Sequence, residues 1–248
     1  LGDVYKRQLK QSRIFVEVVD HPGCRELNLE WFFALHHKRP FVRLKIATTL
    51  DGFFALKNGE SKYITGSGAR TRVHELRALS QGILTSAKTI EQDHAQLTVR
   101  LENYTGPHPK VFVLPSRRRE LSKQENGAPV SRTTSCELIS GQDLSSIDPA
   151  RLTLLDPDIT LKSNLEKLYS DFSIHSLLVE AGPALSGSFL AESGLVQELY
   201  HFMAPKYFGD GIGFSTPIQF ENLSGRCGVR IQFEKIEPEE FLVKSFFY

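Results

Sequence analysis

The stretch that decides the fold is Leu44–Gly52, LKIATTLDG, in which an apolar run ends at an Asp-Gly pair. An apolar run of this length before a turn signal indicates a buried strand, and Asp-Gly is a frequent turn former. The loop sequence GESKYITG follows at residues 59–66, and a helical pattern begins at residue 68. A strand, a loop and a helix in this order predict an α/β domain whose loop lies near the end of the strand.

The chain from residue 41 onward repeats this alternation. Strands are predicted at residues 42–46, 82–84, 110–114, 152–155, 175–179 and 198–203, with helices at 68–79, 164–171 and 184–192. Residues 229–247 instead predict two strands of an antiparallel hairpin. We therefore expect a mixed, mostly parallel α/β sheet flanked by helices, with the hairpin at its edge. Residues 115–150 lack periodicity, so most of them are expected to form a surface loop.

The first forty residues follow other patterns. Residues 13–18, RIFVEV, predict a strand. Residues 24–38 predict one amphipathic helix that ends at Arg39-Pro40, and its apolar side holds Leu27, Trp31, Phe32 and Leu35. The first eight residues show neither pattern, and we expect them to be the end of a fragment that takes no part in the fold.

Composition excludes several classes of protein. The 248 residues carry 30 Lys plus Arg against 29 Asp plus Glu, so no net basic charge attracts nucleic acid or an anionic membrane. The three cysteines, Cys24, Cys136 and Cys227, are far apart and form no Cys-x-x-Cys pair, which argues against zinc and against a disulfide framework. No apolar stretch reaches the roughly 20 residues of a membrane span. We expect a soluble, cytoplasmic protein.

The loop after the first strand offers groups that bind phosphate. Gly59, Glu60 and Ser61 supply backbone amides and a hydroxyl, and Thr65 or Ser67 can cap the next helix, whose N-terminus favours an anion. Farther on, Leu-Thr-Val-Arg ends at Arg100, whose guanidinium can hold a phosphate by two hydrogen bonds. Taken singly, these residues also have structural interpretations, which are a simple turn at Asp51-Gly52, a packed lysine stem at Lys45 and a surface charge at Arg100.

A second ligand-binding pattern begins at Val179. The sequence VEAGPALSGS, residues 179–188, reads as a strand that ends in a carboxylate, followed by a glycine turn and the start of a helix. Sheets of α/β proteins present ligands at the carboxyl ends of their strands. Gly182 permits close approach of a ligand, and the helix amides that follow can receive a pyrophosphate.

These motifs, in this order, resemble the reductase half of the bacterial riboflavin-biosynthesis deaminase/reductase. The resemblance covers about residues 24–210 and implies a dihydrofolate-reductase-like fold. It implies that residues 1–40 are the tail of a missing N-terminal deaminase domain and that residues 41–248 form a reductase domain. It also implies an NADPH-dependent enzyme that reduces the ribosyl side chain of 5-amino-6-(5-phosphoribosylamino)uracil to the ribityl form, and a homodimer.

The resemblance also assigns residues. It implies Lys45 and Glu180 as the catalytic pair, and it implies a substrate site made of Ser61, Arg77, Leu97, Arg100 and Glu180. The cofactor site that it implies comprises Ala47, Tyr63, Thr89, Asp93, Ser116, Gly182, Pro183, Ala184, Leu185, Ser186, Gly187 and Ser188. No metal site is expected, because the histidines show no ligand spacing. The His-x-Glu and Pro-Cys-x-x-Cys motifs of zinc deaminases are also missing, so we expect no deamination.

The chain departs from the family pattern at four positions. Tyr63 stands where tryptophan is usual, His94 and Ala95 replace an Asp-Pro pair, and Pro115 replaces an aspartate before Ser116. Two other interpretations therefore stay open. One is a related reductase that acts on another pterin or pyrimidine, and the other is a degenerate ligand-binding or scaffold module of the same fold.

Overall fold

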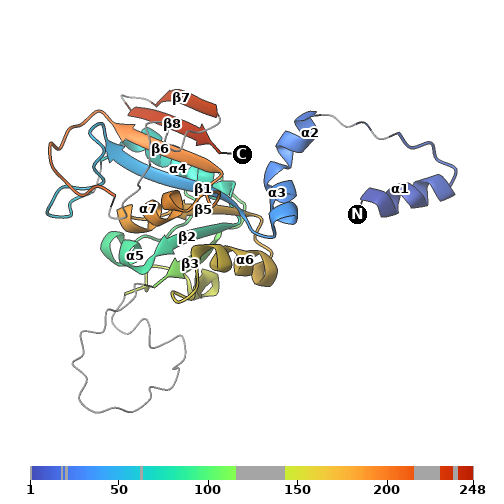
Figure 1. The fold of residues 1–248 in the computed structure, drawn as a ribbon, viewed down its shortest axis with the longest axis horizontal. Coiled ribbons are helices and arrows are strands. Elements are labelled where there is room, and N and C mark those ends of the chain that lie inside the picture. The colour runs from blue at the N-terminus through green and yellow to red at the C-terminus, as the bar shows by residue number, and fades with distance from the viewer. Residues whose placement is uncertain are drawn as a thin grey trace, which may run out of the picture.

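The central feature of the fold is one eight-stranded sheet with the strand order β4-β3-β2-β5-β1-β6-β8-β7 (Figure 1). The computed structural model describes residues 2–17, 19, 22–61, 64–115, 143–214, 230–236 and 240–247. Its strands are β1 Phe41–Thr49, β2 Gly82–Ser86, β3 Lys110–Leu114, β4 Leu152–Leu154, β5 Ser176–Glu180, β6 Glu198–Ala204, β7 Arg230–Ile236 and β8 Glu240–Phe246. The first six strands pair in parallel, whereas β8 pairs antiparallel with both β6 and β7.

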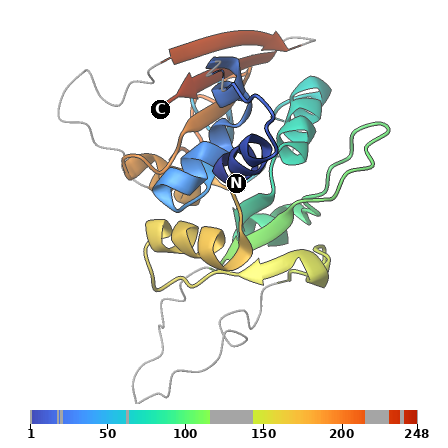
Figure 2. The ribbon, with the colours of Figure 1, turned by 90° about the vertical axis from the view of Figure 1, so that its right-hand side faces the viewer.

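Helices cover both faces of this sheet because its central strands are apolar on both sides. On one face, α6 Leu161–Phe172 and α7 Pro183–Ala191 bury Leu165, Leu168 and Phe189 against the strands. On the other face, α4 Ser67–Ala78 and α5 Ala87–Asp93 bury Leu76 and Ile90. Figure 2 shows α4 and α6 on opposite sides of the sheet. Two apolar clusters, one on each face, therefore hold the strands in place.

The predicted α/β architecture is confirmed. Each predicted strand from residue 42 to residue 203 overlaps an observed one, and the C-terminal hairpin forms as β7 and β8. The short helix α5 was not predicted, although Ser86 caps it by accepting a hydrogen bond from the Thr89 amide at 3.2 Å. Of the surface loop predicted at 115–150, residues 116–142 lie outside the described part of the chain.

The predictions for the first forty residues were wrong in detail. No element was predicted for the first eight residues, but α1 spans Gly2–Gln11, a segment with several good helix formers. Residues 13–17 form no strand, and among the described residues no other strand pairs with them.

The single helix predicted over 24–38 is divided into α2 Pro22–Leu27 and α3 Leu29–His37. The division falls at Asn28, whose side-chain amide donates to the Cys24 carbonyl at 2.9 Å and so competes with helical bonding. Three of the four residues on the predicted apolar side, Leu27, Trp31 and Phe32, are exposed, and only Leu35 is half-buried. Instead, Phe33 contacts Phe41 of β1 with ring centroids 5.5 Å apart.

The Asp-Gly pair after β1 makes the tight turn that the sequence indicates. The Gly52 amide donates to the Thr49 carbonyl at 3.0 Å, and Gly52 has φ 86°, which glycine adopts without strain. The Asp51 carboxylate accepts from the amides of Phe208 and Gly209 at 2.9 and 2.7 Å. Asp51 therefore ties the end of β1 to the segment after β6. No helix in the described ranges is long and apolar enough to cross a membrane.

Candidate active site

A cavity of about 800 Å³ opens where β1, β5, α4, α5 and α7 meet. Its volume lies within the usual range of small-molecule sites. Among the residues that line it are the following predicted site residues: Lys45, Ala47, Ser61, Arg77, Thr89, Asp93, Leu97, Arg100, Glu180, Gly182, Pro183, Ala184 and Leu185. The fold therefore gathers in one place residues that are far apart in the sequence.

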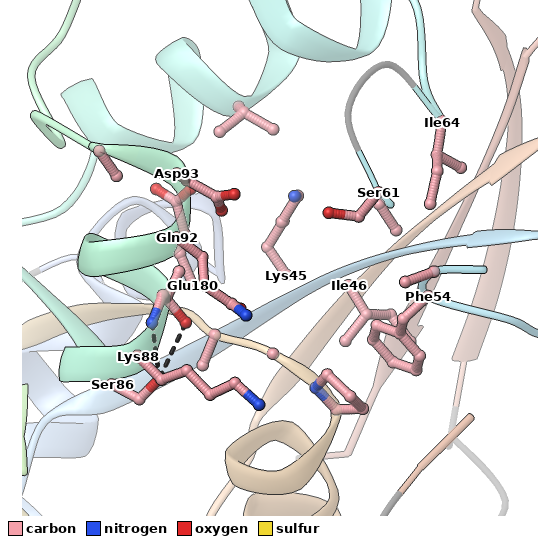
Figure 3. Close-up of a pocket in the computed structure, with 18 of the residues that line it drawn as sticks. Lys45, Ile46, Phe54, Ser61, Ile64, Ser86, Lys88, Gln92, Asp93 and Glu180 are labelled. Atoms are coloured by element: carbon pink, nitrogen blue, oxygen red, sulfur yellow. Dashed lines mark hydrogen bonds between the residues drawn. The ribbon is translucent and has the colours of Figure 1, made fainter. Parts of the chain in front are cut away.

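Lys45 and Glu180 face each other across two neighbouring strands. They are register partners in the parallel pair of β1 and β5, so their side chains leave the same face of the sheet. Lys45 is half-buried, and burial lowers the pKa of its amine, an effect that Glu180 partly opposes. No hydrogen bond or ion pair joins the Lys45 amine to another described residue, and Figure 3 shows the amine pointing into the cavity. The amine is thus free to contact a ligand.

Glu180 is held by Arg77 of α4. The Nε and Nη2 atoms of Arg77 donate to the two Glu180 carboxylate oxygens at 2.6 and 2.9 Å, and Nη1 donates to the Thr98 carbonyl at 3.0 Å. Burial by itself raises the pKa of Glu180, but the charges of Arg77 and Lys45 outweigh it and hold that pKa below its ordinary value. Glu180 is therefore a carboxylate fixed by a bidentate bond, and much of the bonding capacity of Arg77 is directed to it.

Basic side chains gather on the α4 side of the cavity. Arg70, His74 and Arg77 lie on one side of α4 at spacings of four and three residues and line the cavity together with Arg100. The His74 Nδ1 accepts from the Arg100 amide at 3.2 Å. Burial, followed by the charges of Arg77 and Arg100, lowers the pKa of His74. The exposed Arg100 guanidinium has no hydrogen bond or ion pair with the described residues, so it can bind an anion.

The backbone at Leu97 has an unusual conformation. Its φ is 50°, in the left-handed region that few non-glycine residues adopt. Arg151, which lies outside the cavity, holds this segment: its Nη2 donates to the carbonyls of Leu97 and Pro109 at 2.7 and 2.8 Å. Leu97 is thus kept at the cavity wall by contacts from outside the site.

The N-terminus of α4 is not the anion site that the sequence suggested. Gly66, rather than Thr65 or Ser67, is its N-cap residue, and it provides no side-chain cap. The buried carboxylate of Glu240, from the C-terminal hairpin, accepts hydrogen bonds from the Gly66 amide and from the Ala69 amide, the latter at 3.3 Å. An internal carboxylate therefore occupies the position at which a phosphate was expected, and it satisfies the first turn of the helix.

Hydroxyl and amide groups line the opposite side, formed by α5 and α7. The Ser86 and Thr89 hydroxyls are 2.9 Å apart, and no side chain caps α7 at Gly182. Figure 3 shows Ser86 and Lys88 on one side of the cavity, with the Lys45 amine and the Ser61 hydroxyl on the other.

Three of the predicted cofactor residues that the structure describes, Ser186, Gly187 and Ser188, do not line the cavity. Ser186 and Gly187 are buried, and the Ser186 and Ser188 hydroxyls donate to the carbonyls of Ala181 and Ala184, both at 3.1 Å. Tyr63 and Ser116 lie outside the described residues. Among the residues that the structure describes, no group of three or more His, Cys, Asp or Glu side chains could hold a metal ion.

The sequence prediction missed several polar residues of the cavity, namely Arg70, His74, Ser86, Lys88 and Gln92. The helical spacing from Arg77 could have indicated Arg70 and His74. Lys88 directly precedes the predicted Thr89 and Ser86 lies three positions before it, but identifying them requires the helix start that was not predicted.

An α/β sheet with an acid, a base and basic groups around one cavity defines a ligand-binding protein of the α/β class, with the ligand near the ends of parallel strands. Residues 40–239 match the family model described as the RibD C-terminal domain. The chain belongs to this family.

Curated relatives agree with this assignment. The chain is 31% identical over 227 residues to the riboflavin biosynthesis protein RibD of Buchnera aphidicola, covering 85% of this chain and 60% of that protein. It is 35% identical over 214 residues to RibD of Escherichia coli, covering 81% of this chain and 58% of that protein. The chain thus spans about three fifths of the length of these relatives.

Solved structures show the same architecture. Acinetobacter baumannii RibD, form 2, matches with a TM-score of 0.74 at 27% identity, covering 96% of this chain and 66% of that chain. The riboflavin biosynthesis reductase Rib7 of Saccharomyces cerevisiae matches with a TM-score of 0.57 at 18% identity, covering 88% of this chain and 99% of that chain, a likeness of fold alone. The fold of this chain is the dihydrofolate-reductase-like fold.

Proposed function

We propose that the domain formed by residues 41–248 is an NADPH-dependent reductase, which converts 5-amino-6-(5-phosphoribosylamino)uracil to 5-amino-6-(5-phosphoribitylamino)uracil in riboflavin biosynthesis. The observation that carries the proposal is that Lys45 and Glu180 are strand-register partners at the wall of one cavity. Arg70, His74 and Arg77 of α4 line the same cavity. Membership of the RibD C-terminal domain family supports it. A solved Thermotoga maritima relative, 27% identical with a TM-score of 0.66, is named a deaminase/5-amino-6-(5-phosphoribosylamino)uracil reductase.

The residues on the α5 and α7 side fit a dinucleotide. Phosphates need N–H donors, hydroxyls and positive charge, and this side offers the uncapped start of α7 and the Ser86 and Thr89 hydroxyls. We assign the NADPH site to Ala47, Thr89, Asp93 and residues 182–185, which line the cavity, and by the resemblance alone to Tyr63 and Ser116, whereas Ser186, Gly187 and Ser188 would support the start of α7 from within the helix. NADPH, when bound, supplies the hydride that reduces C1′ of the sugar.

The substrate belongs on the α4 side. Ser61, Leu97 and Arg100 would place the phosphoribosyl group, with the free guanidinium of Arg100 as the main phosphate contact. Arg77 would contact the substrate only with the donors that Glu180 and Thr98 leave unused, so its larger role is to fix Glu180.

We assign proton transfer to Lys45, with Glu180 beside it. As the C1′–O bond of the ribosyl ring opens, the ring oxygen needs a proton, and the Lys45 ammonium can donate it. Burial makes this ammonium a stronger acid than an exposed lysine, because it lowers the pKa of the amine. The Glu180 carboxylate keeps the lysine charged enough to act and orients the substrate beside it.

The direct test follows NADPH absorbance with substrate generated in place by a separate deaminase. We expect the wild-type chain to turn over, and Lys45→Met and Glu180→Gln to lose about 100-fold or more in kcat, the usual contribution of a positioned acid. A matched control is Lys162→Met, an exposed lysine on α6 outside the cavity. Full turnover in both cavity variants would remove the catalytic pair from the mechanism.

A homodimer is the second part of the proposal. The edge strand β7 and its neighbour β8 expose Ile231, Phe233 and Phe241 on one face of the hairpin. An apolar edge strand is a surface that proteins usually cover. We propose that a second copy of the chain covers it.

A further inference from the structure

Lys88 is a basic residue of the cavity that the assignments above do not use. It lies in the first turn of α5, is exposed, and lines the same cavity as Lys45 and Glu180. Its amine makes no hydrogen bond or ion pair with another described residue, not even with Glu91 one turn farther along α5. A lysine on the wall of a cavity, without an internal carboxylate partner, is placed to bind an anion from outside the chain.

The position of Lys88 separates it from the other basic groups. Among the cavity residues in the described ranges, the remaining lysine and arginines are Lys45 on β1, Arg70 and Arg77 on α4, and Arg100. Lys88 is the one Lys or Arg that the segments of α5 and α7 contribute. In Figure 3 it lies with Ser86, across the cavity from Ser61 and the amine of Lys45. The cavity thus has two separate cationic regions.

Two cationic regions suit two ligands that both carry phosphate. The substrate of the proposed reaction has one phosphate, for which Arg100 and Arg70 lie on the α4 side. The second ligand, a dinucleotide, carries a pyrophosphate and in NADPH also a 2′-phosphate. Around Lys88 stand the Ser86 and Thr89 hydroxyls, and the uncapped start of α7 lines the same cavity. Lys88 would add the full positive charge that this region otherwise lacks.

We propose that Lys88 is a phosphate-binding residue of the dinucleotide subsite. This inference rests on the proposed NADPH-dependent function. It adds to that function the residue that contacts a cofactor phosphate. Its ammonium binds either the 2′-phosphate or the pyrophosphate. The two sources differ in one respect that can be measured, because NADH carries the pyrophosphate but not the 2′-phosphate.

The test is a fluorescence titration of NADPH and, separately, of NADH onto the full chain without substrate. Lys88→Ala is expected to weaken NADPH binding about tenfold, or about 1.4 kcal/mol, and Lys88→Arg, which keeps the charge, to stay within about threefold of wild type. Lys162→Ala removes an equal charge from the exposed face of α6 and is the control. An unchanged NADH affinity in Lys88→Ala identifies the 2′-phosphate, and an equal loss for both nucleotides identifies the pyrophosphate.

Other outcomes overturn the inference. If wild type binds NADPH and Lys88→Ala binds it equally well, Lys88 makes no phosphate contact, while the proposed reductase function stands. A loss confined to the KM of the phosphorylated substrate would assign Lys88 to the substrate side instead. If wild type binds neither nucleotide, the proposed function fails together with the inference. Nucleotide binding is read without turnover, and the KM is read in the turnover assay described above, so these cases are distinguishable.

Discussion

At the scale of single residues, the site depends on the buried ion pair of Arg77 and Glu180. Their exposed fractions are 9% and 8%, and both Glu180 oxygens accept from the guanidinium. Removing one member leaves the other charge buried without its partner, which costs far more than the pair contributes in net terms. Replacing either residue should therefore change both the free energy of unfolding and the position of the other side chain.

We predict that Arg77→Met and Glu180→Gln each lower the free energy of unfolding by about 3 kcal/mol. The double variant Arg77→Met/Glu180→Gln, which combines the same two changes, should lose clearly less than their sum, because neither charge of the ion pair is then left buried without the other. Urea denaturation of wild type, both single variants and the double variant measures this. Strict additivity of the single effects would mean that the two side chains do not depend on each other.

The sequence could predict which residue types the site contains but not how they pair. Lys45 and Glu180 are 135 positions apart, and their register follows from the pairing of β1 with β5, which no local pattern encodes. The resemblance to the family brought both residues into the predicted site, yet the bond from Arg77 to Glu180 appeared only in the structure. The Lys88 position was missed because a single lysine has no pattern of its own.

At the scale of elements, the C-terminal hairpin fixes the helix that carries the basic group. Glu240 of β8 is only 4% exposed and accepts from the Gly66 and Ala69 amides at the start of α4. A second link joins Arg72 of α4 to Glu234 of β7. Arg70 and Arg77 are thus positioned by strands that lie more than 150 residues later in the chain.

We predict that Glu240→Ala destabilises the chain by about 1 to 2 kcal/mol, the usual effect of losing a helix cap. The amides of the first turn of α4 should exchange hydrogen faster, and the KM for substrate should rise more than kcat falls. Glu240→Gln should recover part of the loss, because an amide oxygen can still accept. Glu91→Ala, on the exposed face of α5, is the control. Unchanged exchange at α4 in Glu240→Ala would contradict the capping role.

The central strands were predictable from their apolar runs, whereas features decided by one side chain were predicted less well. The central strands have runs of buried apolar residues that indicate strands without knowledge of their partners. The helix predicted over 24–38 failed because a single side chain, Asn28, bonds to the backbone and divides it. The cap of α4 was assigned to nearby residues because the actual cap, Glu240, is remote in sequence.

At the scale of the whole molecule, the exposed apolar face of the hairpin of β7 and β8 is where we expect two copies of the chain to associate. The exposed fraction of Phe233 is 79%, and Ile231 and Phe241 share its face. We predict a dimer by light scattering at micromolar concentration, and a monomer for Phe233→Glu, because a charge in an apolar interface is costly. Leu79→Glu alters an exposed apolar residue at the end of α4 and should leave the dimer intact. A monomeric wild-type chain would contradict the proposed dimer.

The acid sensitivity of the molecule should depend on His201 of β6. Its Nε2 lies 2.7 Å from the Thr48 hydroxyl, and burial lowers the pKa of His201 to about 4. Since the unfolded chain binds this proton near pH 6.5, the stabilisation is complete above that pH and is lost as the pH falls toward 4. Between pH 7 and pH 5 this group should account for about 1 to 2 kcal/mol of the loss in unfolding free energy.

Urea denaturation at pH 7 and at pH 5 tests this dependence. His201→Gln should lose less stability over the interval than wild type, whereas His36→Gln, an exposed position on α3, should keep the wild-type dependence. An identical loss in wild type and His201→Gln would show that another group controls the acid response.

Reduction of the sugar by this chain can be followed directly as hydride transfer to C1′. The chain is incubated with 5-amino-6-(5-phosphoribosylamino)uracil and NADPH deuterated at the transferable C4 position, and the product is analysed by mass spectrometry. We predict a ribitylamino product with one deuterium at C1′, formed by wild type and almost absent with Lys45→Met. Recovery of unreduced substrate, while both ligands bind the wild-type chain, would contradict it.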